Sequence, residues 1–522
     1  MSRPVRIFLW IVAYVVVGLA ITVTIVINRF RPEARNYVIS ALKQRYKSDV
    51  QLGSLQISMF PVVRATGENL VLRVPGRSDL PPMIVIRRFT IEARLRGFFR
   101  NPKRVRKVTL EGLQIHLPPK GTGPGVGSPN STKTSGSKQS TVYPFVLEEV
   151  VADGTQLETL PADPTKDPLK FNIVQLTLHT VGPGLPMTFH AELNNAKPPG
   201  FIHSDGRFGP WNQDEPADTA VAGHYTFSNA NLAVFHGISG TLASSGDYHG
   251  ELDRIDVHGT TDVPDFALTL ANRPIHLRTE FDATVDGTNG DTELHPVHAL
   301  LGNAAFDISG SIERNAFQKH KAIDLRALAK KTGIDDFLRL TIKSPKPPMK
   351  GKIGFDTKVR IPPGETPVIE RMQLDGAFTL AGVHFNTESV QEKIASLSHH
   401  AQGELKDTDA NDVFAQFAGR FTLRNAVLDL PRLTFEVPGA HVDLNGRYAL
   451  SSGDIDFRGT AKLDATVSQM TTGLKHILLK PVDPLFKRDG AGTVLPIRIS
   501  GTTGSPSFKL DIGRVLKRQN EE

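Results

Sequence analysis

Apolar and polar side chains alternate with a period of two through most of the chain after residue 145. Two stretches show the pattern most clearly, and their apolar positions are Ile275, Leu277, Phe281, Val285, Ile353, Phe355, Val359 and Ile361. The positions between them are mostly charged or polar, so each strand has one apolar face and one wetted face. Such strands predict an antiparallel sheet and argue against parallel strands that are buried on both faces.

A short phrase, apolar–Asp–apolar–x–Gly, recurs four times in this part of the chain. It occupies residues 255–259, 306–310, 442–446 and 455–459. We expect its Asp on the solvent face of a strand and its Gly in a turn or bulge at the strand end. Because the spacing is irregular, the phrase argues against a solenoid of fixed period and favours a long antiparallel meander.

The apolar parity changes once within the strand that is predicted around residue 110. Val108 and Leu110 share one parity, whereas Leu113 and Ile115 take the other. A shift of one residue turns every following side chain to the opposite face, unless the chain inserts a bulge. Gly112 lies at the shift, and we predict a bulge there that returns all four side chains to one face.

Helical patterns are short and few. Residues 32–47 predict an amphipathic helix with Val38, Leu42 and Tyr46 on one stripe, and a strand over 51–60 follows it. Further short helices are expected to interrupt the strands and to cover exposed sheet edges. They are placed near residues 323–340, 389–400 and 467–480.

The first residues of the chain contain an uncharged run. A helix over this run spans about 31 Å, which is enough to cross the hydrocarbon core of a bilayer. We therefore predict a single-pass membrane anchor over 7–28, with the apolar residues Ile7, Phe8, Leu9, Trp10, Ile11, Val12, Val15, Val16, Val17, Leu19, Ile21, Val23, Ile25, Val26 and Ile27. The rival interpretation is a signal peptide cleaved after Ala20, but the apolar run continues well beyond that residue, which favours the anchor.

The anchor and the cysteine count together predict where the protein lies. Large domains that follow an anchor are exported largely regardless of nearby charge, so we expect residues 1–6 in the cytoplasm and the bulk of the chain in the periplasm. The chain has no cysteine and therefore no disulfide. This suits a bacterial periplasmic protein with a large core better than a small secreted scaffold.

The aromatic composition bears on the class of ligand. The chain has 28 Phe against 7 Tyr and 2 Trp, whereas bases and sugars are usually bound on Tyr and Trp. Phe offers only an apolar ring, which fits either a lipid-facing surface or an ordinary core. The net charge of +7 is scattered along the chain, so we predict no nucleic-acid partner.

The sequence carries no recognisable catalytic motif. It has no HExxH, GxSxG or Walker motif and no cysteine nucleophile, so we expect no enzyme activity, no cofactor and no metal. His295 and His298 have no third ligand at a metal-binding spacing, and we interpret them as part of a surface turn. The adjacent His399 and His400 point to different helix faces. The Gly-, Ser- and Thr-rich residues 120–141 are interpreted as a flexible loop.

Several segments at both ends of the chain resemble the AsmA family. In order, they are 52–61 (LGSLQISMFP), 67–70 (GENL), 105–117 (VRKVTLEGLQIHL), 376–378 (GAF), 390–394 (VQEKI) and 490–497 (GAGTVLPI). The motifs are degenerate, and their order after the anchor carries the resemblance. AsmA-like proteins are similar to chorein-type bridge-like lipid transfer proteins, whose strands form a long gutter with an apolar floor. The resemblance implies anchoring in the inner membrane of a Gram-negative bacterium and offers no catalytic residues to carry over.

The pattern and the resemblance together imply a mainly β fold. A transmembrane helix is followed by an elongated, twisted antiparallel β-sheet gutter, a repeating β-groove with a few short capping helices. The expected organisation is a cytoplasmic N-terminus (1–6), the transmembrane helix (7–28), an AsmA-like N-terminal helix with the first strands (29–119), the flexible loop (120–141) and an extended β-groove region (142–522).

Two functions follow from this reading, and the sequence leaves both open. The first is a periplasmic groove that binds lipid acyl chains on the apolar positions of 275–285 and 353–361 and contributes to phospholipid transport and outer-membrane biogenesis. The second is a structural or regulatory factor in outer-membrane protein assembly, without lipid transfer, whose sheets are closed sandwiches. The expected partners are phospholipids, the inner membrane and components of outer-membrane assembly. An open gutter and a sandwich core share one strand pattern, so alternation does not separate them.

Overall fold

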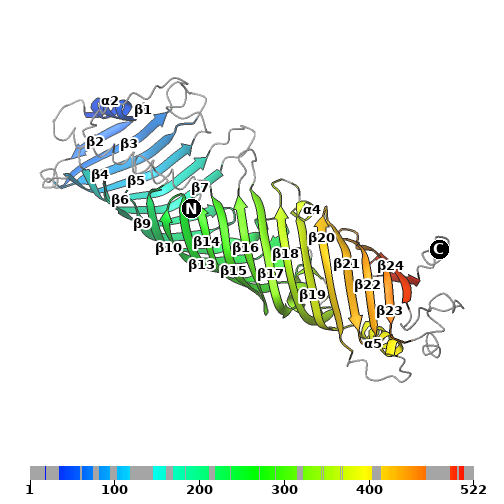
Figure 1. The fold of residues 1–522 in the computed structure, drawn as a ribbon. Coiled ribbons are helices and arrows are strands. Elements are labelled where there is room, and N and C mark those ends of the chain that lie inside the picture. Colours follow the sequence, from blue (N-terminus) through cyan, green and yellow to red (C-terminus); the bar gives the residue numbers. More distant parts are fainter. Residues whose placement is uncertain are drawn as a thin grey trace, which may run out of the picture. The chain divides into compact units, whose positions relative to one another are not determined.

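The computed structural model describes most of the chain. It covers Gly18, 34–465 and 494–510, with gaps at 47, 59–61, 74–80, 95–102, 118–144, 160–168, 183, 211–217, 236, 270, 288–289, 314–320, 343, 345, 365, 367, 403–412 and 503–504. The described residues are mainly β, with 72% in strands and few in helices (Figure 1). One large, mostly antiparallel sheet holds 24 of the described strands, so the predicted mainly β, antiparallel fold is confirmed.

The chain divides into two compact units. The first comprises 1–231, 242–260 and 282–292, and the second comprises 232–241, 261–281 and 293–522. The elements of the first unit are α2 (Ala34–Tyr46), β1 (Asp49–Gln51), β2 (Ser54–Ser58), β3 (Val63–Arg73), β4 (Ile84–Ala93), β5 (Lys103–Leu117), β6 (Phe145–Thr159), β7 (Leu169–Val181), β8 (Met187–Ala196), β9 (Pro199–Phe208) and β10 (Ala220–Asn231).

The remaining elements lie in the second unit or contribute residues to both. Strands shared between the units are β12 (Thr241–Glu251), β13 (Arg254–Leu268), β14 (Ile275–Asp286) and β15 (Asp291–Leu301). The second unit alone holds η3 (Leu232–Val234), β11 (Ile238–Ser239), β16 (Ala304–Glu313), β17 (Ala322–Gly333), α3 (Asp335–Thr341), β18 (Met349–Ile361), α4 (Val368–Arg371), β19 (Gln373–Phe385), α5 (Glu388–Gln402), β20 (Ala415–Arg424), β21 (Val427–Val437), β22 (Ala440–Ala449), β23 (Asp454–Leu463), β24 (Val494–Thr502) and β25 (Ser505–Leu510).

The first unit begins with the predicted amphipathic helix. The expected helix over 32–47 is observed as α2, and its Val38 and Leu42 are buried in the core of this unit. The single strand expected over 51–60 is wrong, because the chain breaks at Gly53, whose N–H donates to the Glu68 carbonyl. The resulting strands β1 and β2 both pair with β3.

One pair of strands in the first unit departs from the antiparallel pattern. Strands β3, β4 and β5 pair antiparallel in order, and β6 to β10 do the same. Between the two sets, β5 and β6 are parallel. The predicted loop 120–141 lies between these two strands in the sequence and outside the described residues.

The bulge predicted at Gly112 is wrong, because β5 keeps one-to-one register with β4 and β6 through this residue, but the expected burial of all four side chains is observed. Gly112 has φ 61°, and Val108, Leu110, Leu113 and Ile115 on either side of it are all at most 1% exposed. A left-handed residue lets the strand change parity while it keeps its apolar side chains on the buried face.

A left-handed residue also occurs on two other strands of this sheet, at positions in line with Gly112. Asn69 on β3 has φ 53°, and Gly154 on β6 has φ 60°. In the β3–β4 ladder, Glu68 lies opposite Arg88 and Leu70 lies opposite Ile86, so Asn69 sits between these two pairs. The parity step therefore crosses several strands as a row, a feature that one strand's sequence could not reveal.

The second unit is an antiparallel succession of strands. From β16 to β25, each described strand pairs antiparallel with the next. The expected helix over 389–400 is observed as α5. The helix expected over 323–340 is wrong for its first two thirds, since residues 322–333 form β17 and only α3 is helical. Pairing of β17 with β16 and β18 outweighs the helix propensity of its Ala, Leu and Lys residues.

The remaining helical predictions fall largely outside the described part of the chain. The anchor run at 7–28 is described only at Gly18, and the helix expected over 467–480 is not described at all. Among the described residues, no helix has the length and apolar character needed to cross a bilayer.

Candidate functional site

Strand register in the second unit gathers apolar side chains on one face. Residues directly opposite each other in a ladder point to the same side of a sheet. Phe355 lies opposite Ala329 on β17 and Phe378 on β19, and Val359 lies opposite Leu325 and Leu374. The two central positions of the predicted β18 set therefore lie beside apolar partners on both sides.

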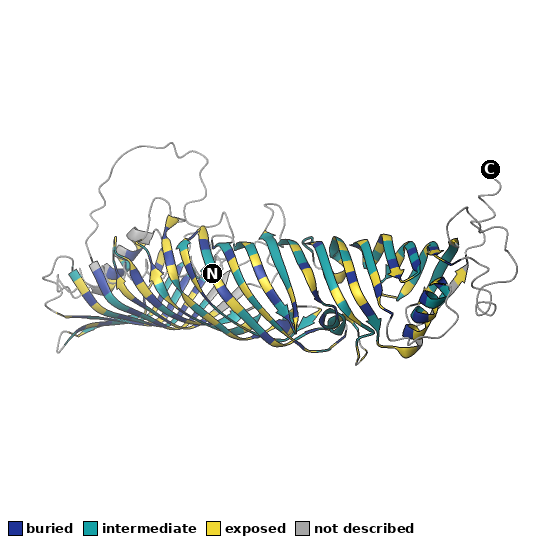
Figure 2. Ribbon diagram, turned by 60° about the horizontal axis from the view of Figure 1, so that its bottom comes forward, coloured by how far each residue is buried: buried dark blue, intermediate teal, exposed yellow. Residues whose placement is uncertain are grey.

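The same face continues across the strands from β16 to β24. The ladders pass through buried side chains, such as Leu380, Leu423, Phe435 and Val442, and through partly accessible ones. We name the partly accessible set the apolar face: Ile308, Ile323, Leu325, Ile353, Phe355, Val359, Ile361, Leu374, Phe378, Phe417, Phe421, Leu433, Leu444, Phe457, Ile497 and Ile499. Every member is half-buried. In Figure 2, half-buried residues alternate with exposed ones along these strands.

Half-burial distinguishes this face from an ordinary core. The largest fully buried side chains among the described residues all lie between α2 and β5, and Phe89 among them is 0% exposed. The phenylalanines near the middle of β18, β19 and β20 are chemically identical but keep part of their rings accessible. The second unit has a buried core of its own, which includes Leu380, Phe435 and Val442. Phe378 and Leu444 of the apolar face pack against this core while part of their surface stays accessible.

Phenylalanine rings form clusters on the apolar face. Phe306, Phe337 and Phe355 form a triangle with ring centroids 5.5 to 6.5 Å apart, which links β16, α3 and β18. The Phe378 and Phe421 centroids lie 6.1 Å apart on β19 and β20. These separations are typical of favourable aromatic pairs.

Glycines opposite the rings let them lie over the backbone. A Cβ on Gly419 would approach the Phe378 ring to 2.9 Å, and a Cβ on Gly446 would approach Phe457 to 2.6 Å. Gly446 ends one copy of the apolar–Asp–apolar–x–Gly phrase but sits in the middle of β22. The prediction that these glycines mark strand ends is thus wrong there, because the glycine makes room for a cross-strand ring.

The opposite face of the same strands is charged. Arg326 Nε donates to Asp356 Oδ1 at 2.7 Å, and Arg498 Nε donates to Asp456 Oδ1 at 3.2 Å. The hydrogen bond from Arg326 holds the pKa of the Asp356 carboxyl below its ordinary value. Asp456 belongs to the recurring phrase, so its expected position on the polar face is confirmed.

Two helices cover the strand ends at one margin of the apolar face. Helix α5 is fixed there by Gln391, which donates to the Val413 carbonyl at 2.8 Å and accepts from the Phe385 N–H at 3.0 Å. Ser398 on the same helix donates to the Pro438 carbonyl. Helix α3 contacts β18. The prediction that short helices cover sheet edges is wrong for these two, because they lie at the ends of inner strands that pair on both sides.

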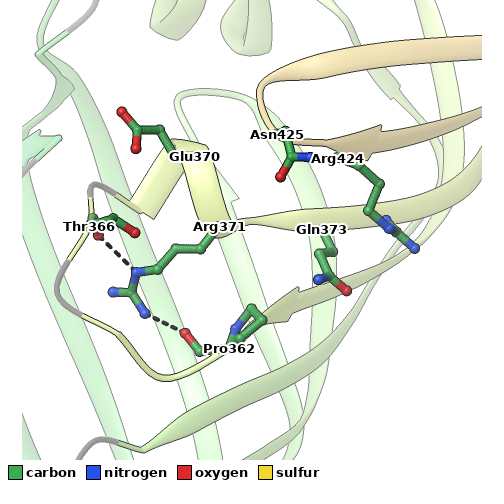
Figure 3. A pocket seen from close by; sticks show the side chains of 7 residues that line it. All are labelled: Pro362, Thr366, Glu370, Arg371, Gln373, Arg424 and Asn425. Carbon is green, nitrogen blue, oxygen red and sulfur yellow. Dashed lines mark hydrogen bonds between the residues drawn. The ribbon is translucent and has the colours of Figure 1, made fainter.

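A polar pocket lies at the opposite strand ends. It encloses about 550 Å³ and is lined by Pro362, Thr366, Glu370, Arg371, Gln373, Arg424 and Asn425 (Figure 3). Arg371 donates to the carbonyls of Thr366 and Pro362, and Arg424 donates to the Leu374 carbonyl at 2.8 Å. These guanidinium groups therefore brace the loops, and the pocket adds polar chemistry beside Leu374 of the apolar face.

The other predicted groove residues lie on β14. Ile275, Leu277, Phe281 and Val285 share one face of that strand, with Ile275 buried and the other three half-buried. Ile275, Leu277 and Phe281 belong to the second unit, whereas Val285 belongs to the first. The predicted alternation of β14 is confirmed, but the ladders described above join only the β18 set to the apolar face.

Sequence reasoning missed most members of the apolar face. Phe378 and Phe421 were not singled out, although period-two alternation runs through both 373–385 and 415–424. The interpretation of His295 and His298 as a surface turn is wrong, since both lie in β15, at positions that face opposite sides of the strand.

The described chain is thus mainly β, and the second unit has one charged and one partly accessible apolar sheet face. Comparison with models of protein families, with curated proteins and with solved structures finds no match for it. The AsmA resemblance therefore rests on the sequence motifs alone.

Proposed function

We propose that this protein binds lipid acyl chains on its apolar face and takes part in phospholipid transport and outer-membrane biogenesis. The observation that carries the proposal is the half-burial of sixteen aligned apolar residues on β16–β24. Each methylene that leaves water for such a surface gains about 0.8 kcal/mol. The function requires no catalytic group, cofactor or nucleic acid.

The rival architecture, a closed sandwich, predicts a different burial. In a sandwich, side chains from two facing sheets interdigitate, and a phenylalanine at mid-strand is fully enclosed. Phe355, Phe378 and Phe421 lie well inside their strands and are only half-buried. This supports an elongated, twisted groove that is open to an occupant over a scaffold of closed sandwiches in outer-membrane protein assembly.

Charge on the opposite face gives the groove its chemical polarity. Ion pairs such as Arg326–Asp356 keep that side hydrated, so only the apolar face offers a surface for lipid tails. Phospholipid headgroups would remain in water along the strand ends, where the pocket at Arg371 and Arg424 supplies cationic groups. Residues 7–28 would anchor the protein in the inner membrane, with its bulk in the periplasm.

Native mass spectrometry of the full chain, purified in mild detergent, tests the proposal. We expect phospholipid to remain bound to the wild-type protein. Phe378→Asp places a carboxylate on the apolar face and should remove most of that lipid, with little loss of thermal stability. Phe378 is preferred to Phe355, because Phe355 also supports α3 through Phe337.

The matched control is Thr379→Asp on the same strand. Thr379 is exposed on the charged face, next in sequence to Phe378. Its substitution should leave both lipid content and melting unchanged. Unchanged lipid in Phe378→Asp, or collapse of its fold, would count against the groove and favour the assembly-factor interpretation.

Membrane attachment has its own test. Full-length protein should sediment with membranes after an alkaline carbonate wash, whereas a chain that begins at Arg31 should be extracted. Mature protein that begins at Ile21 would show that Ala20 is a cleavage site and would refute the anchor.

A further inference from the structure

Four metal-ligating side chains meet on the charged face of β8 and β9, in the first unit. The ladder places His190 opposite Asp205 and Glu192 opposite His203. Alternation within each strand puts all four on the same side of the sheet. Residues from two strands, 11 to 15 positions apart in the sequence, thus form a compact square.

The side chains already converge on one carboxylate. His190 Nδ1 lies 2.7 Å from Asp205 Oδ1, and His203 Nε2 lies 2.7 Å from Asp205 Oδ2. The two imidazole rings are 4.7 Å apart, centroid to centroid. Glu192 Oε1 lies 3.8 Å from His190 Nε2 and 3.9 Å from His203 Nδ1. The two histidines and the aspartate offer three ligand atoms within 4.8 Å of one another.

Pairs of one histidine with one aspartate are common on this protein's polar surface. His224 with Asp247 and His258 with Asp282 are examples, at 3.1 and 2.8 Å. Such pairs are explained by cross-strand hydrogen bonding alone. Among the hydrogen bonds of the described residues, Asp205 is the carboxylate that holds two imidazoles, so simple pairing does not account for this arrangement.

We propose that His190, His203 and Asp205 bind a divalent transition-metal ion, with Zn²⁺ the best fit and water in the fourth position. Glu192 lies beside the other ring nitrogens, His190 Nε2 and His203 Nδ1, and stays outside this ligand set. Zinc takes imidazole nitrogen and carboxylate oxygen at about 2.0–2.2 Å, usually with four ligands. Two histidines favour Zn²⁺, Ni²⁺ or Cu²⁺ over Mg²⁺ or Ca²⁺, which prefer oxygen. The site lies on the charged face and does not depend on lipid binding.

The surrounding structure holds these ligands in place. The β8–β9 ladder runs without interruption from Met187↔Phe208 to Ala196↔Pro199. Ser204, between His203 and Asp205, is buried on the other face, where its hydroxyl donates to the His224 carbonyl and hydrogen-bonds Tyr248. A ligand set on two such strands loses little conformational freedom when it binds an ion.

Only a small rearrangement separates the observed contacts from ligation. In a tetrahedral zinc site, neighbouring ligand atoms are about 3.3 Å apart. The two histidine–aspartate contacts are 2.7 Å. Side-chain rotation that opens each contact by several tenths of an ångström would admit the ion, without movement of the strands.

Zinc titration of the full chain tests the proposal. Detergent-purified protein without a histidine tag is stripped with EDTA, and Zn²⁺ binding is followed by isothermal titration calorimetry. We expect one high-affinity ion per chain and a melting temperature that rises with zinc. Mg²⁺ should neither bind at this site nor compete. Co²⁺ should give the visible absorption of a four-coordinate site.

The variants are chosen to keep the hydrogen bonds and remove the ligands. His190→Asn and His203→Gln place an amide near Nδ1 and Nε2 respectively, so each can still donate to Asp205. Each should weaken zinc binding by at least about tenfold, because even outer-shell changes cost 10–100-fold. His258→Asn, in a pair with a single histidine, is the control and should bind zinc as wild type.

The outcomes distinguish a metal site from a hydrogen-bond cluster. Wild-type melting of the two variants in EDTA would show that they are folded. No stoichiometric zinc, or equal binding by wild type, His190→Asn and His203→Gln, would overturn the proposal. Lipid content is unaffected in every case, so failure here leaves the proposed function untouched.

Discussion

The apolar faces of β3–β5 and of β18–β20 carry the same kind of alternation but differ in what covers them. Phe89 on β4 is fully buried, in a core that includes Val38 and Leu42 of α2. Phe355 on β18 and Phe378 on β19 are half-buried, and α5 meets its strands near their ends. The comparison shows that period-two alternation determines which face of a strand is apolar, but not whether other elements pack over that face. A helix close by in sequence closes the first face, whereas α3 and α5 leave part of the second face accessible.

The largest expected contrast comes from placing a charge on each face. Phe89→Asp buries a carboxylate with no partner, which costs several kcal/mol and should unfold the first unit. Phe378→Asp loses only part of a ring's burial, about 1–1.5 kcal/mol, and its carboxylate reaches water. Thermal unfolding followed by circular dichroism compares the two. Equal loss of stability would erase the distinction between a covered and an open face.

Removing side chains from the covering helices should give the next largest difference. Leu42→Ala in α2 leaves a cavity in a closed core and should lower stability by about 2–5 kcal/mol. Phe337→Ala in α3 removes a half-buried ring from the Phe306–Phe355 cluster, for about 1–1.5 kcal/mol. Urea titration monitored by fluorescence or circular dichroism provides both values. A larger effect for Phe337 would mean that α3 closes the second face.

Glycine packing under aromatic rings should matter wherever the ring is fixed. A Cβ on Gly67 would collide with the Phe89 ring, which has no room to move in the core. Gly67→Ala should therefore lower stability by about 1–3 kcal/mol, the usual cost of overpacking. Gly333→Ala is the control, because no atom lies within 4 Å of the added Cβ. Differential scanning calorimetry should show a lower melting temperature for Gly67→Ala and little change for the control.

Substitution on the charged faces should have the smallest effect, and a similar one in both regions. Arg64–Glu92 and Arg326–Asp356 are both solvent-exposed pairs. Arg326 lowers the pKa of Asp356 from its ordinary value of 3.8. The pair therefore stabilises the folded state fully at pH values above 3.8, and this stabilisation is lost as the pH falls through the lowered pKa.

Melting of Arg326→Gln and Arg64→Gln across pH 2–7 tests this expectation. The loss of stability against wild type should be small at neutral pH for both variants and vanish at about 1 M salt, where charges are screened within about 3 Å. The loss in Arg326→Gln should also shrink in acid, as Asp356 becomes protonated. A large loss of stability in only one of the two variants would show that the charged faces of the two regions differ in energetics, as their apolar faces do in burial.

Much of the fold could be predicted because face alternation is local. The strands around 275–285 and 353–361, the helix α2 and the parity change at Gly112 all follow from side-chain spacing. Where propensity and pairing conflict, the local signal fails. Residues 323–333 contain good helix formers, yet they form β17 because two neighbouring strands supply ladder partners.

The sequence by itself determined which side of each strand is apolar, because side chains on a strand alternate regardless of its neighbours. It also determined that the chain favours phenylalanine and has no cysteine. Only the tertiary structure decided which residues meet across strands. Cross-strand register places Phe457 over Gly446 and brings His203 and His190 to the same carboxylate. Cover is equally non-local, because it depends on where helices such as α2 and α5 dock. Alternation alone therefore could not distinguish a closed core from a partly accessible apolar face.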